Sequence, residues 1–449
     1  MMDYQSFKNA VIAKCSALGI AEYELYYQAG SSTSIDTFRH EINEFSASEE
    51  GGVCFRCIVN GKMGYASTED LSDAQAAAIV ERAVDNASVL ESEEAVFLCE
   101  GGQKYETLDR EGYALPSTDE LVATALAVEK KLYEYDPMVI DGSQVNVLTG
   151  SSETAIYNSK GLDLYEKNAY SGMVTVAVVT NGTEMSNDYQ IKIGELKKLD
   201  TDAAVKKAVD TAKQKLGGDV APTAVCPVVF SPEAMCSLLG VFCSIFSSEA
   251  AQKGLSKFAD KEGSKIASDI VTLVDDPMHK DNSFPSVFDA EGCPTRKKNV
   301  IENGVLNTLL YNLKTAAVAG KKTTGNASKG GYASPVGVRP FTMYLAGGNC
   351  SEAELLKKAG NGVYIDSLSG LHAGANAISG DFSLQSAGFL IRDGEKTDFV
   401  KSFTVAGNFY DLLNKITALA DNVTLPSPFG STTFGAPSVL VEDLSIAGK

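Results

Sequence analysis

The chain has 449 residues, 44% of them hydrophobic and 22% charged, which is typical of a soluble globular protein with room for two domains. Its net charge of -19 and pI near 4.7 exclude direct binding to a nucleic acid, because such a surface repels the phosphate backbone. No apolar stretch reaches the roughly 18 residues of a membrane span, and the first residues carry no basic segment followed by an apolar one, so we expect a cytoplasmic protein.

In chain order, the first predicted elements are a helix at Tyr4–Leu18 and a strand at 22–28. Two strand-like runs then flank Asn60-Gly61, a pair that accepts the positive φ of a tight hairpin turn. The same signal returns at Asn181-Gly182, Asn303-Gly304 and Asp393-Gly394, which favours antiparallel sheet. Alanine-rich runs with helical periodicity predict further helices at 71–90, 119–135 and 202–216.

The loop-forming residues between 217 and 222 predict a domain boundary. Gly217-Gly218-Asp219 is followed by Pro222 and by a new strand at 227–230. Beyond it, glycine-rich loops and short strands dominate. We therefore predict an α+β fold with two domains: residues 1–218, with an antiparallel sheet and helices, and residues 219–449, rich in β-structure.

The cysteines indicate no metal or disulfide framework. Nine of them are scattered from Cys15 to Cys350, so reduced thiols are expected. Cys54 and Cys57 have the spacing of a metal or redox pair, but on a strand they point to opposite faces and no second such pair exists. We interpret them as structural.

Three histidines are present, and none has the spacing of a metal site. His40-Glu41 begins like a zinc-binding helix, but 35–45 is predicted to be one strand. His279 lies in a polar stretch, and His372 lies in a glycine-rich loop typical of ligand contacts. The carboxylates with acid–base potential, Asp289, Glu291 and Asp381, are interpreted first as loop and turn residues.

A series of short motifs, in order along nearly the whole chain, resembles the TldD/PmbA family, historically called modulators of DNA gyrase. The motifs are Gly51-Gly52-Val53 with Arg56, Asn60-Gly61-Lys62-Met63-Gly64-Tyr65-Ala66-Ser67, Asn158-Ser159-Lys160-Gly161, Phe288-Asp289-Ala290-Glu291-Gly292-Cys293-Pro294-Thr295, Ile301-Glu302-Asn303-Gly304-Val305-Leu306, Ser379-Gly380-Asp381-Phe382-Ser383, Ala387-Gly388-Phe389-Leu390-Ile391 and Val405-Ala406-Gly407-Asn408.

Chains of this family divide into two types by one feature. TldD-type chains carry a His-Glu-x-x-x-His helix and a late cysteine that form a zinc site, whereas PmbA-type (TldE) chains lack them. Here the corresponding helix starts at Ser231, a natural N-cap, and Pro232, but the chain has no histidine between His40 and His279. The late segment 421–435 has no cysteine. The resemblance therefore implies a PmbA/TldE-type subunit without a metal, a cofactor or catalytic residues of its own.

That resemblance implies a partner: a TldD-like zinc peptidase subunit that cleaves short or unfolded peptides in a shared chamber. A metal-free chain would contribute strand edges and glycine loops that pair with an extended peptide backbone. From family position and loop composition, the predicted peptide-binding residues are Gly374, Asn376, Gly380, Asp381 and Phe382.

Two other functions stay open at this point. One is a self-sufficient peptidase with an atypical site built from His372 and nearby carboxylates. The other is a non-enzymatic interaction protein, such as a modulator of DNA gyrase, whose acidic surface binds a basic partner or imitates DNA. Self-association of the isolated chain as a homodimer is also left open.

Overall fold

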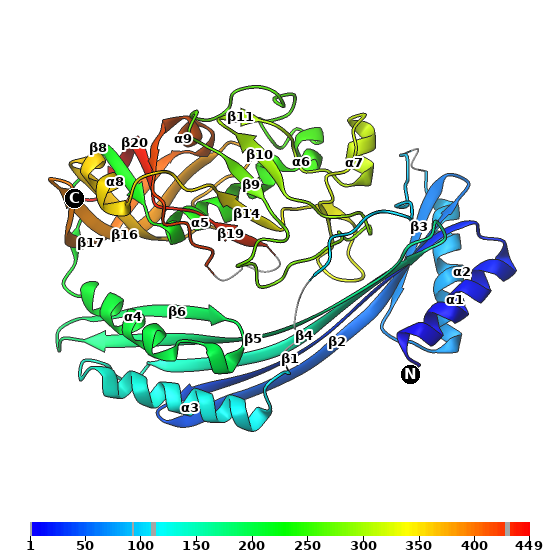
Figure 1. Cartoon of the computed structure of the whole chain (residues 1–449), viewed down its shortest axis with the longest axis horizontal. Coiled ribbons are helices and arrows are strands. Elements are labelled where there is room, and N and C mark those ends of the chain that lie inside the picture. Colours follow the sequence, from blue (N-terminus) through cyan, green and yellow to red (C-terminus); the bar gives the residue numbers. More distant parts are fainter. Residues whose placement is uncertain (1, 92–93, 109–113, 427–431) are drawn as a thin grey trace.

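The computed structural model describes residues 2–91, 94–108, 114–426 and 432–449. Its N-terminal half contains one antiparallel sheet with strand order β3-β2-β1-β4-β5-β6, in which four strands are unusually long (Figure 1). The strands are β1 (Glu22–Phe38), β2 (Glu41–Val59), β3 (Lys62–Thr68), β4 (Gln144–Asn158), β5 (Asp163–Thr180) and β6 (Met185–Ile193).

Two pairs of helices cover opposite ends of this sheet (Figure 1). The helices α1 (Tyr4–Leu18) and α2 (Asp73–Val89) bury an apolar core around Phe7, Phe55 and Ile79 at one end. The helices α3 (Thr118–Tyr135) and α4 (Thr201–Gln214) bury a second core at the other end. All four predicted helices are confirmed within two residues at each boundary.

The asparagine–glycine and aspartate–glycine turns are confirmed as hairpin turns. Asn60 and Gly61 have φ of 50° and 75°, and Asn303 and Gly304 have 48° and 80°. Asn181-Gly182 lies between β5 and β6, and Asp393-Gly394 lies between two later strands.

One strand prediction is wrong. Instead of a single strand at 35–45, β1 ends at Phe38 and a tight turn at Arg39 and His40, with φ of 53° and 66°, leads into β2. Histidine is enriched at positive φ among non-glycine residues but arginine is not, so the sequence carries a much weaker turn signal there than an asparagine–glycine pair. The Cys54 and Cys57 prediction is confirmed, since the two thiols lie in different buried clusters on opposite faces of β2.

The C-terminal half is rich in β-structure, as predicted. A seven-stranded sheet contains β18 (Ile416–Leu419), β20 (Val439–Ala447), β8 (Ala224–Phe230), β15 (Gly362–Ser369), β16 (Asp381–Arg392), β17 (Glu395–Asn408) and β7 (Asp219–Val220), in that order. Because β20 also pairs with β17, the five strands from β20 to β17 close on themselves. The predicted mixed α+β class is confirmed.

A second sheet and several short helices complete this half. The sheet contains β11 (Val305–Leu306), β10 (Lys298–Glu302), β9 (Leu273–Asp275), β14 (Thr342–Leu345) and β19 (Thr433–Gly435), in that order, and β12 (Ala327–Ser328) pairs with β13 (Gly337–Val338). The helices are α5 (Pro232–Phe242), α6 (Ser248–Gln252), α7 (Leu313–Val318), α8 (Glu352–Ala359) and α9 (Phe409–Lys415), with a 3-10 turn at Cys243–Phe246. A further 3-10 turn, Leu196–Lys198, precedes α4 in the N-terminal half.

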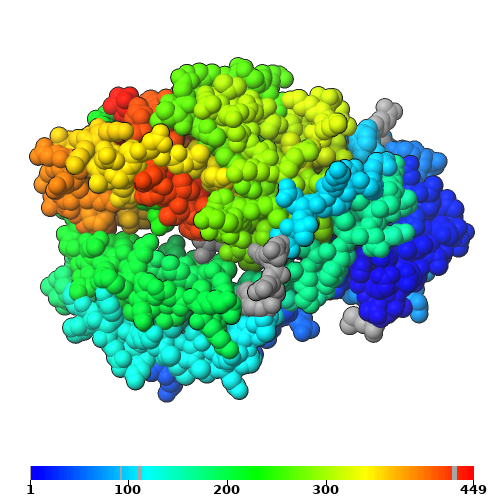
Figure 2. Space-filling view, in the orientation of Figure 1, coloured from blue at the N-terminus to red at the C-terminus, as the bar shows by residue number. Residues whose placement is uncertain are grey.

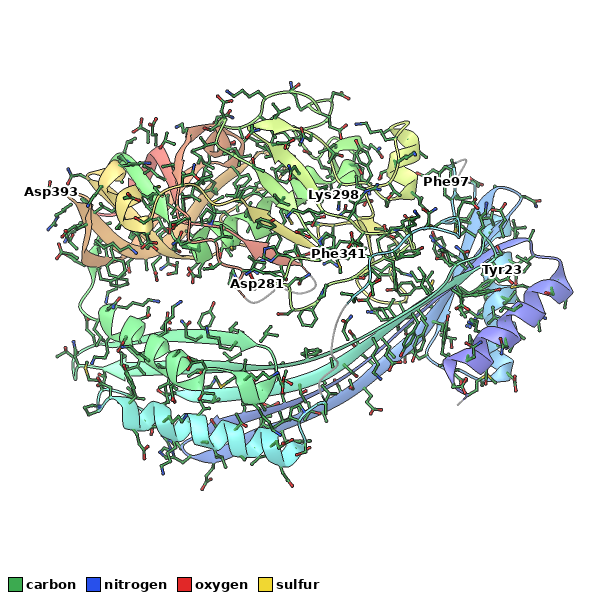
Figure 3. All side chains as sticks on the ribbon, in the orientation of Figure 1. Tyr23, Phe97, Asp281, Lys298, Phe341 and Asp393 are labelled. Atoms are coloured by element: carbon green, nitrogen blue, oxygen red, sulfur yellow. The ribbon has the colours of Figure 1, made fainter. Side chains whose placement is uncertain are left out.

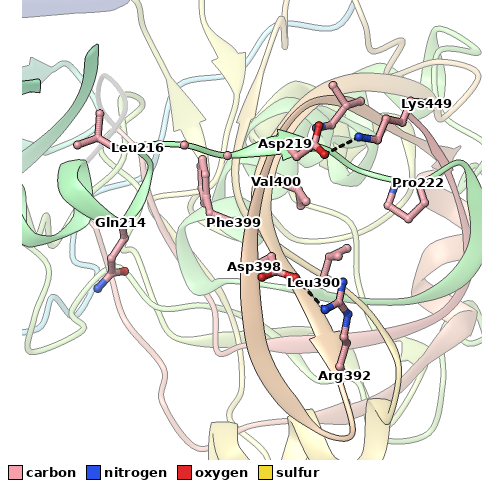
Figure 4. A pocket seen from close by; sticks show the side chains of 13 residues that line it. Gln214, Leu216, Asp219, Pro222, Leu390, Arg392, Asp398, Phe399, Val400 and Lys449 are labelled. Carbon is pink, nitrogen blue, oxygen red and sulfur yellow. Dashed lines mark hydrogen bonds and ion pairs between the residues drawn. The ribbon is translucent and has the colours of Figure 1, made fainter. Parts of the chain in front are cut away.

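The connection between the two halves runs from α4 to β7, and the predicted boundary after residue 218 falls within it. Beside it lies a cavity of about 500 Å³, lined by residues of this connection and by the β16–β17 hairpin (Figure 4). Arg392 and Asp398 form an ion pair of 2.8 Å at its wall.

Candidate functional site

The helix α5, at the position where the family resemblance places a zinc-binding helix, is one of the most deeply buried elements of the C-terminal half. Ser231 caps it: its Oγ accepts a hydrogen bond from Ala234 N at 3.0 Å and donates one to Asp366 O at 2.9 Å. Met235, Leu239 and Phe242 are buried in the main core. The predicted cap and apolar face are therefore confirmed.

The side chains of α5 do not fit a zinc ion. Its two potential ligands are Glu233, which is exposed and pairs with Lys207 at 3.6 Å, and Cys236, whose thiol pKa is raised by burial. Within the described ranges, no group of three or more histidine, cysteine, aspartate or glutamate side chains is arranged to hold a metal ion. No metal-dependent step can be assigned to α5.

None of the three histidines belongs to α5. His40 lies at the far end of the N-terminal sheet, where its backbone N–H donates to Glu129 Oε2 at 2.9 Å and its ring lies 4.6 Å from that of Tyr133. His279 lies in a loop, with its ring 5.1 Å from that of Tyr344. His372 is exposed in the loop between β15 and β16.

That loop also brings together the five predicted peptide-binding residues. Asn376 forms its turn: its Oδ1 accepts from Ile378 N at 2.9 Å, and its O accepts from Gly380 N at 2.8 Å. Gly374 O accepts from Ser383 N at 2.7 Å, which closes the base of the loop.

Asp381 and Phe382 begin β16 and point in opposite directions. Asp381 is exposed, and Asn408 Nδ2 donates to its Oδ1 at 2.8 Å, which holds the pKa of the carboxyl below its usual range. Phe382 is buried, with its ring 6.2 Å from that of Phe242 on α5. The loop surface is thus formed by Asn376 and Asp381, while Phe382 anchors it against α5.

A second cluster of charges is buried where the two halves meet, at the α1–α2 end of the sheet. Arg56 Nε on β2 donates to Glu24 Oε1 on β1 at 2.7 Å, and Arg56 Nη1 lies 3.9 Å from Glu291 Oε1. All three side chains are at most 6% exposed. A buried guanidinium needs a carboxylate beside it, because its charge has lost its hydration.

Asp289 and Glu291 form the turn that carries this cluster on the C-terminal side. Asp289 Oδ1 accepts from Glu291 N and Cys293 N, both at 2.9 Å, so the carboxylate shapes the turn. Burial raises the pKa of Asp289 to about 6 and that of Glu291 to about 7, where the mutual repulsion of the two carboxylates also contributes. A Cβ at Gly292 would lie 2.5 Å from Leu162 Cδ1 of the N-terminal half, so this glycine permits close contact.

The sequence singled out Asp289 and Glu291, and Arg56 as a residue of the first family motif, but it singled out neither Glu24 nor the contact among these side chains. Glu24 and Arg56 lie on predicted strands, where charged side chains are usually solvated, and no spacing pattern links them to residue 291. The carboxylates Asp289 and Glu291 contact this junction, whereas Asp381 contacts Asn408 on the β15–β16 loop side. They therefore belong to different parts of the molecule.

At the opposite end, the two halves are joined by ion pairs near the connection. Lys207 on α4 lies 3.6 Å from Glu233, Lys215 lies 3.6 Å from Asp366, and Lys401 lies 3.5 Å from Glu184. Between this end and the buried cluster, the surface is hollowed (Figure 2). Asp281, in the loop after β9, lies on the side of the C-terminal half that faces the sheet (Figure 3).

Comparison with known proteins agrees with this arrangement of parts. Three family models match in sequence order: PmbA/TldA metallopeptidase domain 1 over residues 23–87, the central domain over 113–216 and the C-terminal domain over 223–448. The chain belongs to the PmbA/TldD metallopeptidase family. The resemblance read from the motifs is thereby confirmed.

Individual PmbA/TldD relatives are similar over almost their whole length. The Haemophilus influenzae metalloprotease PmbA homolog is 25% identical over 427 residues, which covers 93% of this chain and 90% of that protein. The structure of TldE from Thermococcus kodakarensis has a TM-score of 0.87 and 25% identity, covering 98% of this chain and 99% of that one. A Thermotoga maritima protein described as a candidate modulator of a DNA gyrase has a TM-score of 0.89 and 29% identity, covering 99% and 100%.

One further property concerns membranes. None of the helices in the described part of the chain has the length and apolar character that crossing a bilayer requires.

Proposed function

We propose that this chain is a TldE-type subunit without a metal ion, and that it assembles with a TldD-like zinc subunit to degrade or process short or unfolded peptides. The observation that carries the proposal is the chemistry of α5. By the family resemblance this helix corresponds to the zinc-binding helix of TldD-type chains, but it offers Glu233 and Cys236 where two histidines and a glutamate would be needed. The similarity to TldE supports the same assignment.

The peptide contact proposed for this subunit is the loop between β15 and β16. Asn376 and Asp381 are exposed there, and Gly374 and Gly380 let the backbone turn close to β16. Polar backbone groups and small side chains suit an unfolded peptide, because they pair with a main chain without selecting its sequence.

The proposal is tested by purifying this chain alone, a TldD-like chain from the same genome alone, and both together. We expect peptide cleavage and stoichiometric zinc only when the TldD-like chain is present, and higher cleavage in the mixture than with either chain. Cleavage or stoichiometric zinc in this chain alone contradicts the proposal and favours a self-sufficient peptidase. Recovery of gyrase in a pull-down that contains no TldD-like chain favours the modulator function.

A substitution on the proposed contact separates assembly from peptide binding. We expect Asp381→Ala to raise the KM of the mixed complex for a peptide substrate while co-purification with the TldD-like chain is unchanged. Asp393→Ala, at the distant hairpin turn between β16 and β17, is the matched control and should leave both unchanged. Equal KM values for the two variants would show that Asp381 does not contact the peptide.

A further inference from the structure

Two buried cysteine side chains from distant parts of the sequence meet at the junction of the two halves. Cys99 and Cys293 are 4% and 2% exposed, and their Sγ atoms are 2.9 Å apart. This is shorter than the approximately 3.5–4.0 Å at which non-bonded carbon atoms pack, and within about 1 Å of a disulfide bond. Both thiols are free in this structure.

The backbone holds each cysteine in place from its own side. Asn158 Nδ2, at the end of β4, donates to Cys99 O at 2.9 Å. Asp289 fixes Cys293 by two hydrogen bonds: its Oδ1 accepts from Cys293 N at 2.9 Å, and its N donates to Cys293 O at 2.8 Å. The approach of the two sulfurs is therefore set by ordered backbone, which is what disulfide geometry requires.

Cys99 belongs to a segment that crosses from one half to the other. Within 94–108, Tyr105 Oη donates to Gly292 O at 2.8 Å, and Glu94 forms an ion pair with Lys314 on α7. Phe97 of this segment lies near α7 and the upper end of the sheet (Figure 3). The segment has no helix or strand in its described part, so these side-chain contacts and the hydrogen bond from Gly101 N to Lys160 O at 2.9 Å hold it.

We propose that Cys99 and Cys293 are a reversible disulfide site, which closes when the protein meets a small-molecule disulfide such as oxidised glutathione. Closure would join the 94–108 segment covalently to the turn that carries Asp289 and Glu291. Closure would thus add a covalent bond to the buried charges and apolar contacts that join the two halves there.

The exchange proceeds in two balanced steps. The Cys99 sulfur, after losing its proton to solvent, attacks one sulfur of oxidised glutathione, forms a mixed disulfide and releases one glutathione thiolate. The Cys293 sulfur then attacks Cys99 Sγ and expels the second glutathione. Two protein thiols are oxidised and one small disulfide is reduced to two thiols, and the two thiolates take up the two protons that the cysteines lose.

Cys54 provides a matched control within the same apolar cluster. It is 3% exposed, as deeply buried as the pair, and its sulfur makes a weak contact to Phe55 O at 4.0 Å and interacts with the Lys329 ammonium. If burial in this cluster alone made a thiol reactive, Cys54 would be modified as well. The proposal assigns reactivity to the sulfur pair only.

The test incubates the full chain with oxidised glutathione, alkylates the remaining thiols in denaturant, and maps the products by proteolysis and mass spectrometry. We expect a loss of two titratable thiols, a Cys99–Cys293 linked peptide, and full return of both thiols with dithiothreitol. The melting temperature should rise by about 3–5 °C, because a disulfide across a long loop restricts the unfolded chain. Cys54→Ala should behave like wild type. In Cys99→Ala, Cys293 should keep its thiol, and oxidised glutathione should not raise the melting temperature.

Mapping on the wild-type chain decides the question even if a variant fails to fold. Two intact thiols at Cys99 and Cys293 under conditions that oxidise a surface thiol overturn the proposal. So does a stable mixed disulfide with glutathione at either position, or a link from either cysteine to Cys54.

Discussion

The buried charges at the junction make a quantitative prediction about Arg56. Arg56→Met keeps most of the side-chain volume but leaves Glu24, which is 2% exposed, and Glu291, which is 5% exposed, without their cation. Removing one partner from a buried ion pair costs about 3–5 kcal/mol, since a charge then lies uncompensated away from water. We expect the free energy of unfolding, measured by urea denaturation, to fall by that amount.

Two further variants isolate the cause. Arg392→Met removes an arginine whose ion pair with Asp398 is 58% and 64% exposed, and should cost at most about 1 kcal/mol. Adding Glu24→Gln to Arg56→Met neutralises the unpaired carboxylate and should recover part of the loss. Burial of charge is not the cause if Arg56→Met and Arg392→Met lower the free energy of unfolding by the same amount. Nor is it the cause if the loss in the Arg56→Met, Glu24→Gln double variant equals the sum of the two single losses.

Three other outcomes follow from the same geometry. The pKa of Glu291 is raised from 4.5 to about 7 in the folded chain, so the folded state keeps a proton that the unfolded state loses as pH rises between these values. Stability therefore falls over this window. We expect the urea midpoint of wild type to fall more than that of Glu291→Gln. Gly380→Ala places a Cβ 2.4 Å from Tyr410 Cδ2 at a φ of 85°, so we expect a loss of more than about 1 kcal/mol, seen as a lower urea midpoint. Ser231→Ala removes a buried N-cap and should cost about 1–2 kcal/mol by the same assay, with unchanged zinc content.

The parts of the fold that the sequence predicts are those with a local physical cause. Asn60-Gly61 forms a hairpin turn because both residues tolerate positive φ, and Ser231-Pro232 begins a helix because the hydroxyl caps it and proline needs no N–H donor there. The turn at Arg39 and His40 has no such cause within its own residues. The hydrogen bond from His40 N to the buried Glu129 of α3 stabilises it, and that contact exists only after folding.

The junction cluster was beyond prediction for a related reason. Glu24, Arg56 and Glu291 each have an ordinary local setting, and their significance comes from being buried together. The motif at 288–295 identified the residues of the Asp289–Gly292 turn, but it does not indicate which part of the molecule the turn contacts. The lack of a histidine pair on α5, by contrast, can be seen in the sequence itself, because residue types do not depend on folding.

The two contacts between the halves differ in kind, and the difference bears on how a peptide would reach the hollow under the proposed function. Near the α4–β7 connection the contacts include the exposed Lys207–Glu233 pair, and such pairs contribute little, but the chain itself holds the halves together there. At the other end no covalent bond spans the junction in this structure, and Arg56 and its carboxylates lie in a shared apolar core. Separating the halves there would expose that core and rehydrate the charges in one cooperative step. Under the proposed function, an extended peptide would therefore enter the hollow between two fixed ends, and a bulky folded substrate would be excluded unless the junction itself opened.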